Sequence, residues 1–161
     1  MVKVLIKKLS PKVKLPSYKT SGASGMDLMA FINSSITIKP KTSCLIPTGL
    51  SMAFSENYEV QIRPRSGLAA KHNISVLNTP GTIDSDYRGE IKVIIYNHSK
   101  SDFLVNNKDR IAQMILTPVK KMKFEETDEL PKTIRGEGGF GSTGKWKKKL
   151  KKKKLRDFQD K

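Results

Sequence analysis

Residues 74–90 combine a turn with side chains that could recognise a nucleotide and attack it with water. Asn78 carries an amide that can donate and accept hydrogen bonds at the edge of a base, and Asp84 carries a carboxylate that can take a proton from water. Tyr87 offers a flat face for packing against a sugar. Singly, such residues are more typical of turn capping and strand packing, so their combination within one segment is what indicates chemistry.

A β-hairpin is the element expected to position these side chains. A β-rich run over residues 74–77 enters an Asn-Thr-Pro-Gly turn at 78–81, and the return arm carries Ile83, Asp84 and Tyr87. A Pro-Gly turn between two apolar runs favours this arrangement. One short hairpin could therefore both bind a nucleotide and react with it.

Short strand-like runs separated by turn residues predict an all-β fold. Tyr58, Val60 and Ile62 alternate on one face, which would pack in a core while the opposite face meets solvent or ligand. The runs at 90–97 and 110–116 are almost continuously apolar, so both of their faces should be covered, and another subunit could cover the second. The spacing is typical of an antiparallel sandwich, with strands expected at 2–7, 36–39, 43–50, 58–63, 90–97 and 110–116 and a turn running into a strand at 23–30.

The only convincing helical stretch is brief and begins at Ser66. A helix N-terminus attracts anions, and here it would combine the Ser66 hydroxyl, a close-approach glycine at Gly67 and the guanidinium of Arg65. This pattern indicates an anion site. An ordinary helix N-cap is the alternative.

Asp27 and Gln113 are two further polar residues in strand-like surroundings. An acidic residue at the start of a strand, such as Asp27, is most often part of the preceding turn. Gln113 lies in an otherwise apolar strand, so its amide needs a hydrogen-bond partner. That partner could be a phosphate, an arginine contact or the backbone.

The composition limits the class of protein. With 161 residues the chain is long enough for one domain with an ordinary core. Cys44 is the only cysteine, which excludes a disulfide framework and a cysteine-based zinc site, and His72 and His98 are not at metal-ligand spacing. Lysines interrupt the N-terminal apolar residues and no long apolar run follows, which predicts a soluble, intracellular protein with no membrane segment.

The charge of the chain is concentrated at its C-terminal end. Residues 145–161 contain ten lysines or arginines against two aspartates, a net +8 that is half of the +16 of the whole chain. Consecutive lysines repel one another and favour a solvated, disordered tail. Such a tail could tether the protein to nucleic acid without sequence preference, and a targeting signal or no role are the alternatives.

A glycine-rich segment at 135–144 precedes this tail, and such segments are most often disordered. Its glycines could also let backbone amides wrap a phosphate, while Arg135 and Phe140 supply a cation and an aromatic face. The expected organisation is a catalytic body at 1–131, a mobile arm at 132–144 and a disordered basic tail at 145–161.

Five segments in order, over roughly residues 20–144, resemble the motifs of the trimeric dUTP diphosphatase (dUTPase) family. The longest match is the third, Asn78 followed by the gap-free run Gly-Thr-Ile-Asp-Ser-Asp-Tyr-Arg-Gly-Glu at 81–90. The others are Ala-x-Gly-x-Asp-Leu, the start of the predicted helix, Asp-Arg-Ile-Ala-Gln-Met and the glycine-rich segment, at 23–28, 64–71, 109–114 and 135–144.

This resemblance implies an antiparallel β-sandwich or jelly roll assembled as a symmetric homotrimer. Each active site would draw on three chains. The first, second and fourth motifs would come from one subunit, the hairpin of the third motif from a second, and the arm of the fifth motif from a third.

The reaction that the resemblance implies is hydrolysis of dUTP to dUMP and pyrophosphate, which keeps uracil out of DNA and supplies dUMP for thymidylate synthesis. Asp84 would be the base for water attack at the α-phosphorus. Mg²⁺ would be held mainly by the triphosphate, with Asp27 supporting it indirectly through water. Tyr87 would lie beneath the deoxyribose and exclude the 2′-hydroxyl of UTP. The substrate-binding residues implied are Arg65, Ser66, Gly67, Asn78, Gly81, Ile83, Tyr87, Gln113, Arg135, Phe140, Gly141, Ser142 and Thr143.

Two other functions are open at this point. A dCTP deaminase, or a bifunctional enzyme, shares the fold, but the Tyr87 hairpin and the Phe140 arm look like those of the diphosphatase. A nucleic-acid-binding regulatory protein on a dUTPase-like body would explain the basic tail, although the intact Asp84 argues against an inactive enzyme. A cytoplasmic location is expected, or a nuclear one in a eukaryote.

Overall fold

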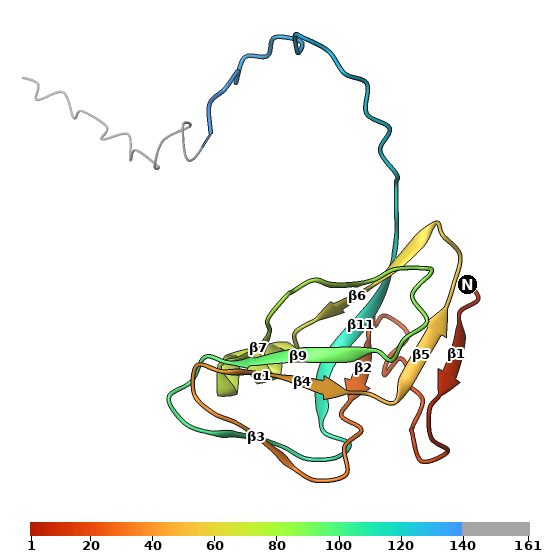
Figure 1. Ribbon diagram of the computed structural model, residues 1–161, viewed down its shortest axis with the longest axis vertical. Helices are drawn as coiled ribbons and strands as arrows, with labels where there is room; N and C mark the ends of the chain where they lie inside the picture. The colour runs from red at the N-terminus through yellow and green to blue at the C-terminus, as the bar shows by residue number, and fades with distance from the viewer. Residues whose placement is uncertain (140–161) are drawn as a thin grey trace, which may run out of the picture. The chain divides into compact units, whose positions relative to one another are not determined.

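The computed structural model describes residues 1–139, and their regular structure is almost entirely antiparallel strand. Internal contacts divide the chain into two units, residues 1–122 and 123–161. All the strands and the helix of the described residues belong to the first unit (Figure 1). They are β1 (Leu5–Lys8), β2 (Met26–Met29), β3 (Ile36–Ile38), β4 (Ser43–Pro47), β5 (Leu50–Ala53), β6 (Tyr58–Arg63), α1 (Ser66–His72), β7 (Ile74–Val76), β8 (Gly81–Ile83), β9 (Lys92–Asn97), β10 (Phe103–Val105) and β11 (Arg110–Pro118).

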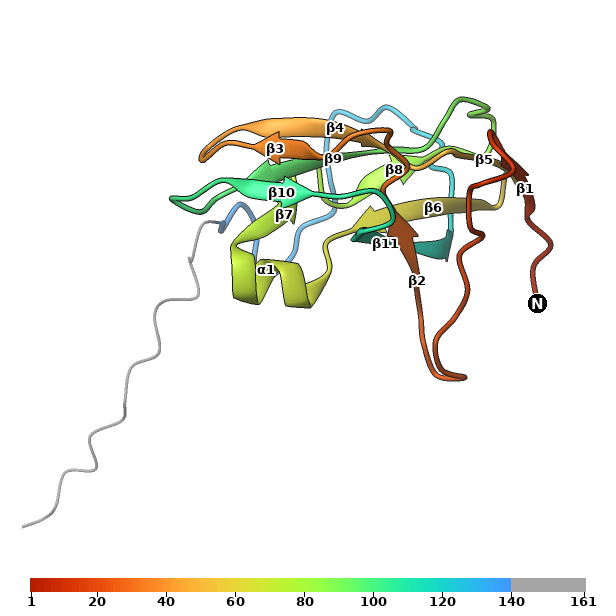
Figure 2. The same cartoon turned by 90° about the horizontal axis from the view of Figure 1, so that it is seen from below.

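Two sheets form the sandwich. One has the strand order β2-β11-β6-β8 and the other β4-β9-β7, and the pairs β1-β5 and β3-β10 form two further two-stranded sheets. Figure 2 shows β4 and β9 on one side of this unit and β6 and β11 on the other. The predicted all-β, antiparallel fold is therefore confirmed. No helix in the described part of the chain has the length and hydropathy needed to span a membrane.

Alternating side chains of the two sheets build the core. In β6, Val60 and Ile62 are buried, as their spacing predicted. In β9, Val93 and Ile95 are 1 % exposed, whereas Ile94 on the opposite face is only half-buried in the single chain. Burying one such aliphatic side chain stabilises the fold by roughly 1.5–3 kcal/mol.

The predicted hairpin at 74–90 is wrong in its pairing. Strand β7 pairs with β9 in the three-stranded sheet, and β8 pairs with β6 in the four-stranded sheet. Both arms have three residues, while β6 and β9 have six each, so each arm completes its backbone hydrogen bonds on a longer neighbour. The turn between the arms is thus a crossing from one sheet to the other.

The second unit is described as far as residue 139. Its clearest feature is a turn in which the Gly136 amide donates to the Thr133 carbonyl at 3.1 Å and the Gly138 amide donates to the Arg135 carbonyl at 3.0 Å. Arg135 donates from Nε to the Gly138 carbonyl at 2.7 Å. The rest of the predicted arm, with Phe140, Gly141, Ser142 and Thr143, and the basic tail lie outside the described residues.

Candidate active site

An open cavity of about 480 Å³ lies beside β8 and the turn that follows it. We call it the Tyr87 cavity. On one side it has the exposed side chains of Asn78, Asp84 and Tyr87, and on the other the apolar side chains of β4 and β9. Its full lining is Leu45, Asn78, Thr82, Ile83, Asp84, Tyr87, Glu90, Lys92 and Ile94. An amide, a carboxylate and an aromatic face around a partly apolar hollow suit a nucleoside, which has a polar edge and flat or apolar faces.

Asn78 lies against the bare backbone of Gly81. A Cβ atom at position 81 would lie 3.1 Å from Asn78 Nδ2 and 3.5 Å from its Oδ1. Gly81 is buried and pairs with Ile62 of β6, so its backbone cannot move aside easily. A side chain at position 81 would therefore displace the Asn78 amide.

Asp84 and Tyr87 occupy the two ends of a single turn. The Tyr87 amide donates to the Asp84 carbonyl at 3.2 Å, which closes the turn. Arg88 fixes the same turn from outside, because its Nη1 donates to the Ser85 carbonyl at 2.6 Å and to the Tyr87 carbonyl at 3.0 Å. These bonds fix the backbone positions from which the carboxylate and the phenol ring extend, although both residues are exposed.

A second open cavity, of about 490 Å³, lies at the start of α1. We call it the Ser66 cavity. Polar side chains and two prolines, one of them in the turn that follows Asn78, line it: Gln61, Arg63, Pro64, Ser66, Thr79, Pro80 and Gln113. The N-cap residue of α1 is Arg65, and its side chain makes no capping hydrogen bond. Ser66 is therefore the first helical residue and not an ordinary N-cap, and the space around Gly67 is open.

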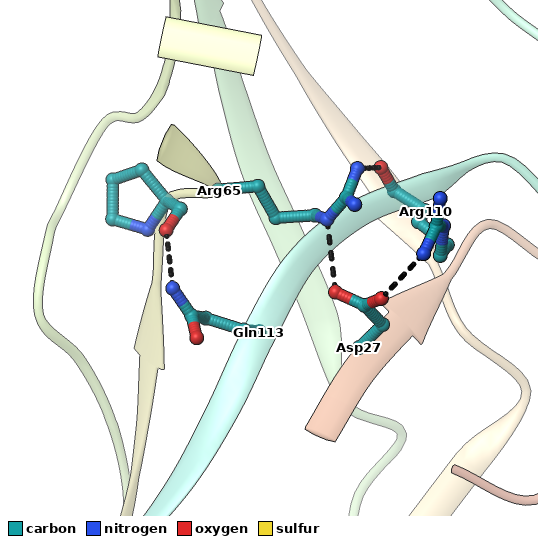
Figure 3. Close-up of polar contacts among 5 residues, drawn as sticks. Asp27, Arg65, Arg110 and Gln113 are labelled. Atoms are coloured by element: carbon teal, nitrogen blue, oxygen red, sulfur yellow. Dashed lines mark hydrogen bonds and ion pairs between the residues drawn. The ribbon is translucent and has the colours of Figure 1, made fainter. Parts of the chain in front are cut away.

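Gln113 occupies the centre of the four-stranded sheet. In the strand register it lies between Asp27 of β2 and Arg63 of β6. Its Nε2 donates to the Pro64 carbonyl at 2.9 Å, so the amide is satisfied by backbone, which was one of the alternatives left open (Figure 3). This bond holds the residue that leads into Arg65 and Ser66.

The Asp27 carboxylate forms ion pairs with two arginines, Arg65 and Arg110, and is not a turn-capping group (Figure 3). Arg65 Nε donates to Oδ1 at 2.8 Å and Arg110 Nη1 donates to Oδ2 at 3.1 Å. Arg65 also donates from Nη1 to the Arg110 carbonyl at 3.1 Å. The Asp27 side chain is 17 % exposed, so these charge-assisted bonds are partly shielded from water. They fix the orientation of Arg65 next to Ser66.

The donor set suits a Mg²⁺ ion that arrives with a polyphosphate. Among residues 1–139 no three His, Cys, Asp or Glu side chains form a metal-binding group. Mg²⁺ usually keeps several waters and takes one or two carboxylates together with substrate phosphates. Asp27 already accepts from two arginines, but each carboxylate oxygen has a second lone pair that could accept a hydrogen bond from a metal-bound water.

The two cavities have no lining residue in common. Of the candidate residues, Asn78, Ile83, Asp84 and Tyr87 line the first cavity and Ser66 and Gln113 line the second, whereas Arg65 lines neither. Sequence reasoning gave no role to Arg110 or to Glu90, whose contacts bridge distant parts of the chain. Arg110 contacts Asp27 across 83 positions of sequence, which no local pattern reveals.

Comparison with known proteins identifies the family. The family model described as dUTPase matches residues 11–144. The deoxyuridine 5′-triphosphate nucleotidohydrolase of Fusobacterium nucleatum is 51 % identical over 146 residues, which cover 90 % of this chain and 100 % of that protein. The protein of the same name from Nautilia profundicola is 54 % identical over 144 residues, covering 89 % of this chain and 100 % of its own.

Solved structures share the fold. The dUTPase of Staphylococcus bacteriophage 80alpha with dUpNHpp superposes with a TM-score of 0.76 at 22 % identity, covering 88 % of this chain and 98 % of that one. A dUTPase from phage phi11 of S. aureus, described with a structural Mg(II) ion, gives a TM-score of 0.72 at 18 % identity and covers 81 % and 99 %. With a family model matched over most of its length and relatives identical at about half of their positions, the chain belongs to the dUTPase family.

Proposed function

We propose that the protein is a dUTP diphosphatase, which hydrolyses dUTP to dUMP and pyrophosphate. The observation that carries the proposal is the Tyr87 cavity, in which an amide, a carboxylate and an aromatic face surround a space of nucleoside size. The relatives at 51 % and 54 % identity carry the name of this activity.

The Tyr87 cavity would bind the deoxyuridine part of the substrate. The Asn78 amide, together with the backbone near Gly81 and Ile83, would pair with the polar edge of uracil. Tyr87 would pack beneath the deoxyribose, where a 2′-hydroxyl would have no space. This contact would separate dUTP from UTP.

Asp84 would act as the general base. Its carboxylate lines the cavity and is exposed to water, so it can orient a water molecule and accept its proton as the oxygen attacks the α-phosphorus. Pyrophosphate would leave from the opposite side of that phosphorus in line with the attack.

The residues around the Ser66 cavity would hold the triphosphate. The Ser66 hydroxyl and the Gly67 amide lie at the start of α1, with Arg65 held beside them by Asp27, and Gln113 supports the same loop through the Pro64 carbonyl. Mg²⁺ bound by the triphosphate would offset negative charge on the phosphates, with Asp27 reaching a metal-bound water.

We further propose that the working enzyme is a homotrimer whose sites are shared. Within one chain the nucleoside group and the phosphate group line separate cavities. Juxtaposition of the Tyr87 cavity of one subunit with the Ser66 cavity of a second would complete a site. The arm of a third subunit would then close over it with Arg135, Phe140, Gly141, Ser142 and Thr143 as contacts to phosphate and base.

The direct test is release of pyrophosphate from dUTP, dCTP and UTP by the purified chain, with ammonia measured in parallel. We expect rapid pyrophosphate release from dUTP and at least about a hundredfold less from the other two. Ammonia from dCTP would instead favour the deaminase, and no turnover of any of the three would leave the regulatory alternative.

The basic residues 145–161 support a second, independent proposal. With a net charge of +8 they would bind nucleic acid through phosphates, without sequence preference. We assign this binding to the tail at 145–161, the closing movement to an arm at 132–144 and catalysis to a body at 1–131, and we propose a cytoplasmic location.

A further inference from the structure

The phenol ring of Tyr87 lies directly against the backbone of Gly89. A Cβ atom at position 89 would collide with Tyr87 Oη, and it would lie 2.5 Å from Cζ and 2.9 Å from Cε2. The φ angle of Gly89 is outside the left-handed region, so the backbone itself would accept another residue. What requires glycine here is the space that the ring occupies.

The far end of the same ring is held by Glu90. Tyr87 Oη donates to the Glu90 backbone carbonyl at 3.0 Å. The Glu90 side chain accepts at Oε1 from the Gly49 amide at 2.8 Å, and it is 22 % exposed. The Ile91 amide donates to the Leu50 carbonyl at 2.8 Å. The carbonyl that receives the phenol is therefore fixed to the turn between β4 and β5.

The near end of the ring is held by the turn closed between Asp84 and Tyr87 and fastened by Arg88. A side chain that is 44 % exposed would ordinarily sample several rotamers, but this one is restrained at its backbone, along its face and at its hydroxyl. Such restraint has a cost in conformational entropy and indicates a task for which the ring must be in one place.

We propose that Gly89 and Glu90 are positioning residues that hold Tyr87 and thereby set the discrimination between deoxyribonucleotides and ribonucleotides. The inference rests on the proposed function, since it assumes that the sugar packs on this ring. A ring that could move aside would admit the ribose and leave the chemistry at Asp84 in place.

The test compares full-length variants by the ratio of kcat/KM for dUTP to kcat/KM for UTP. In Gly89→Ala we expect this ratio to fall at least about tenfold, because the ring must leave its place. In the Tyr87→Ala background the same Gly89→Ala change should alter the ratio less than about twofold, because there is no ring left to displace. Gly22→Ala is the matched control, since nothing lies within 4 Å of its added methyl group.

Glu90 supplies a measurement that does not depend on the Gly89 variant folding. Glu90→Gln keeps an oxygen that can accept from the Gly49 amide, whereas Glu90→Ala removes it. We expect the ratio to stay within about threefold of the parent in the first and to fall about tenfold in the second. Circular dichroism and the unfolding midpoint establish that each variant is folded.

Two results would overturn the inference. One is an unchanged ratio in folded Gly89→Ala together with an unchanged ratio in Glu90→Ala. The other is a fall in the ratio on Gly89→Ala that is as large in the Tyr87→Ala background as in the parent. That result would mean that the substitution acts on the fold as a whole and not through the Tyr87 ring. A third result would refute the sugar contact of the proposed function instead. In it the parent hydrolyses dUTP, but Tyr87→Ala has the same ratio of kcat/KM for dUTP to kcat/KM for UTP as the parent.

Discussion

Asp84 and Asp86 are neighbouring carboxylates of one turn that differ in what they face. Both are exposed, but only Asp84 lines the Tyr87 cavity. Position relative to the cavity, and not residue type, is what makes Asp84 the candidate base. Comparing variants of Asp84 and Asp86 therefore separates the loss of a catalytic base from the loss of a negative charge in the turn.

Replacing Asp84 by asparagine should reduce kcat for dUTP by at least about a hundredfold with little change in KM, because proton acceptance is lost while the shape of the site is kept. Asp86→Asn serves as the control and should stay within about twofold of the parent. Steady-state kinetics of pyrophosphate release measure both. Near-normal turnover in Asp84→Asn would remove Asp84 from the role of base.

Asp27 and Arg65 illustrate why single residues of a site are predicted more easily than their partners. The sequence marked both, one for a turn or a metal and one for an anion. In the structure they contact each other at 2.8 Å, and Arg110 contacts the same carboxylate. These pairs depend on the pairing of β11 with β2 on one side and with β6 on the other, so local sequence carries no signal for them.

At the scale of elements, periodicity predicted the strands well and the strand partners poorly. Alternation located β6, and the start of α1 at Ser66 follows from Pro64 and the serine before a short run of helix formers. The 74–90 segment has the local signature of a hairpin, but its arms pair with β9 and β6. Hydrogen bonding to distant, longer strands outweighed the preference of the turn. Strand β10 was not predicted, and the run expected as one strand at 43–50 is interrupted before Leu50, so that it forms β4 and the start of β5.

Asn97 is the polar residue on which the junction of β9 with the β3–β10 pair depends. It is fully buried, and its Nδ2 donates to the carbonyls of Ile38 and Ser101 at 2.9 and 2.8 Å. Its Oδ1 accepts from the Ser99 amide at 2.9 Å. One side chain therefore bonds three backbone groups, of which the Ser101 carbonyl also accepts from Ser99 Oγ at 2.8 Å.

Asn97→Ala should lower the free energy of unfolding by roughly 2–4 kcal/mol, because it removes three hydrogen bonds of a fully buried side chain, including the buried bond to the Ile38 carbonyl. Urea unfolding at a fixed chain concentration measures the change. Asn33→Ala, at an exposed position, is the control and should cost less than about 0.5 kcal/mol. Equal stability of the two variants would show that water can replace the Asn97 side chain.

At the scale of the whole molecule, the proposed sharing of sites makes inactive variants able to complement each other. Asp84→Asn lacks the base but has its arm, and a chain ending at residue 133 has the base but lacks the arm. Each alone should be nearly inactive. Co-refolded at equal amounts, they should form mixed trimers in which roughly a quarter of the sites combine an intact base with an intact arm.

The measurement is dUTP turnover of the mixture against the sum of the separate variants. Size-exclusion chromatography with light scattering gives the oligomeric state in the same samples. A mixture no more active than the sum, in samples that do contain mixed trimers, would mean that the base and the arm act within one chain.

Removal of residues 147–161 should separate the two proposed activities. The deletion spares every motif residue, so dUTP turnover should remain within about twofold, while retention on DNA or RNA at low salt should be lost. A chain of full length with the tail lysines replaced by glutamine is the control for length and should behave like the deletion. In the parent, the log–log slope of affinity against salt should be about −0.7 to −0.9 for each phosphate neutralised. Unchanged binding after deletion would assign it to the body.

The contacts of Glu90 continue beyond the cavity to the first strand of the chain. The Gly49 amide donates to the Glu90 carboxylate, and the Gly49 carbonyl accepts from the Leu9 amide at 2.8 Å, just after β1. Tyr87 is the other end of this series. Because binding and local unfolding are linked reciprocally, we expect a nucleotide that binds only when the ring is in place to stabilise the N-terminal strand as well. Amide hydrogen exchange near Leu9 would then report the occupancy of a pocket that this residue does not line.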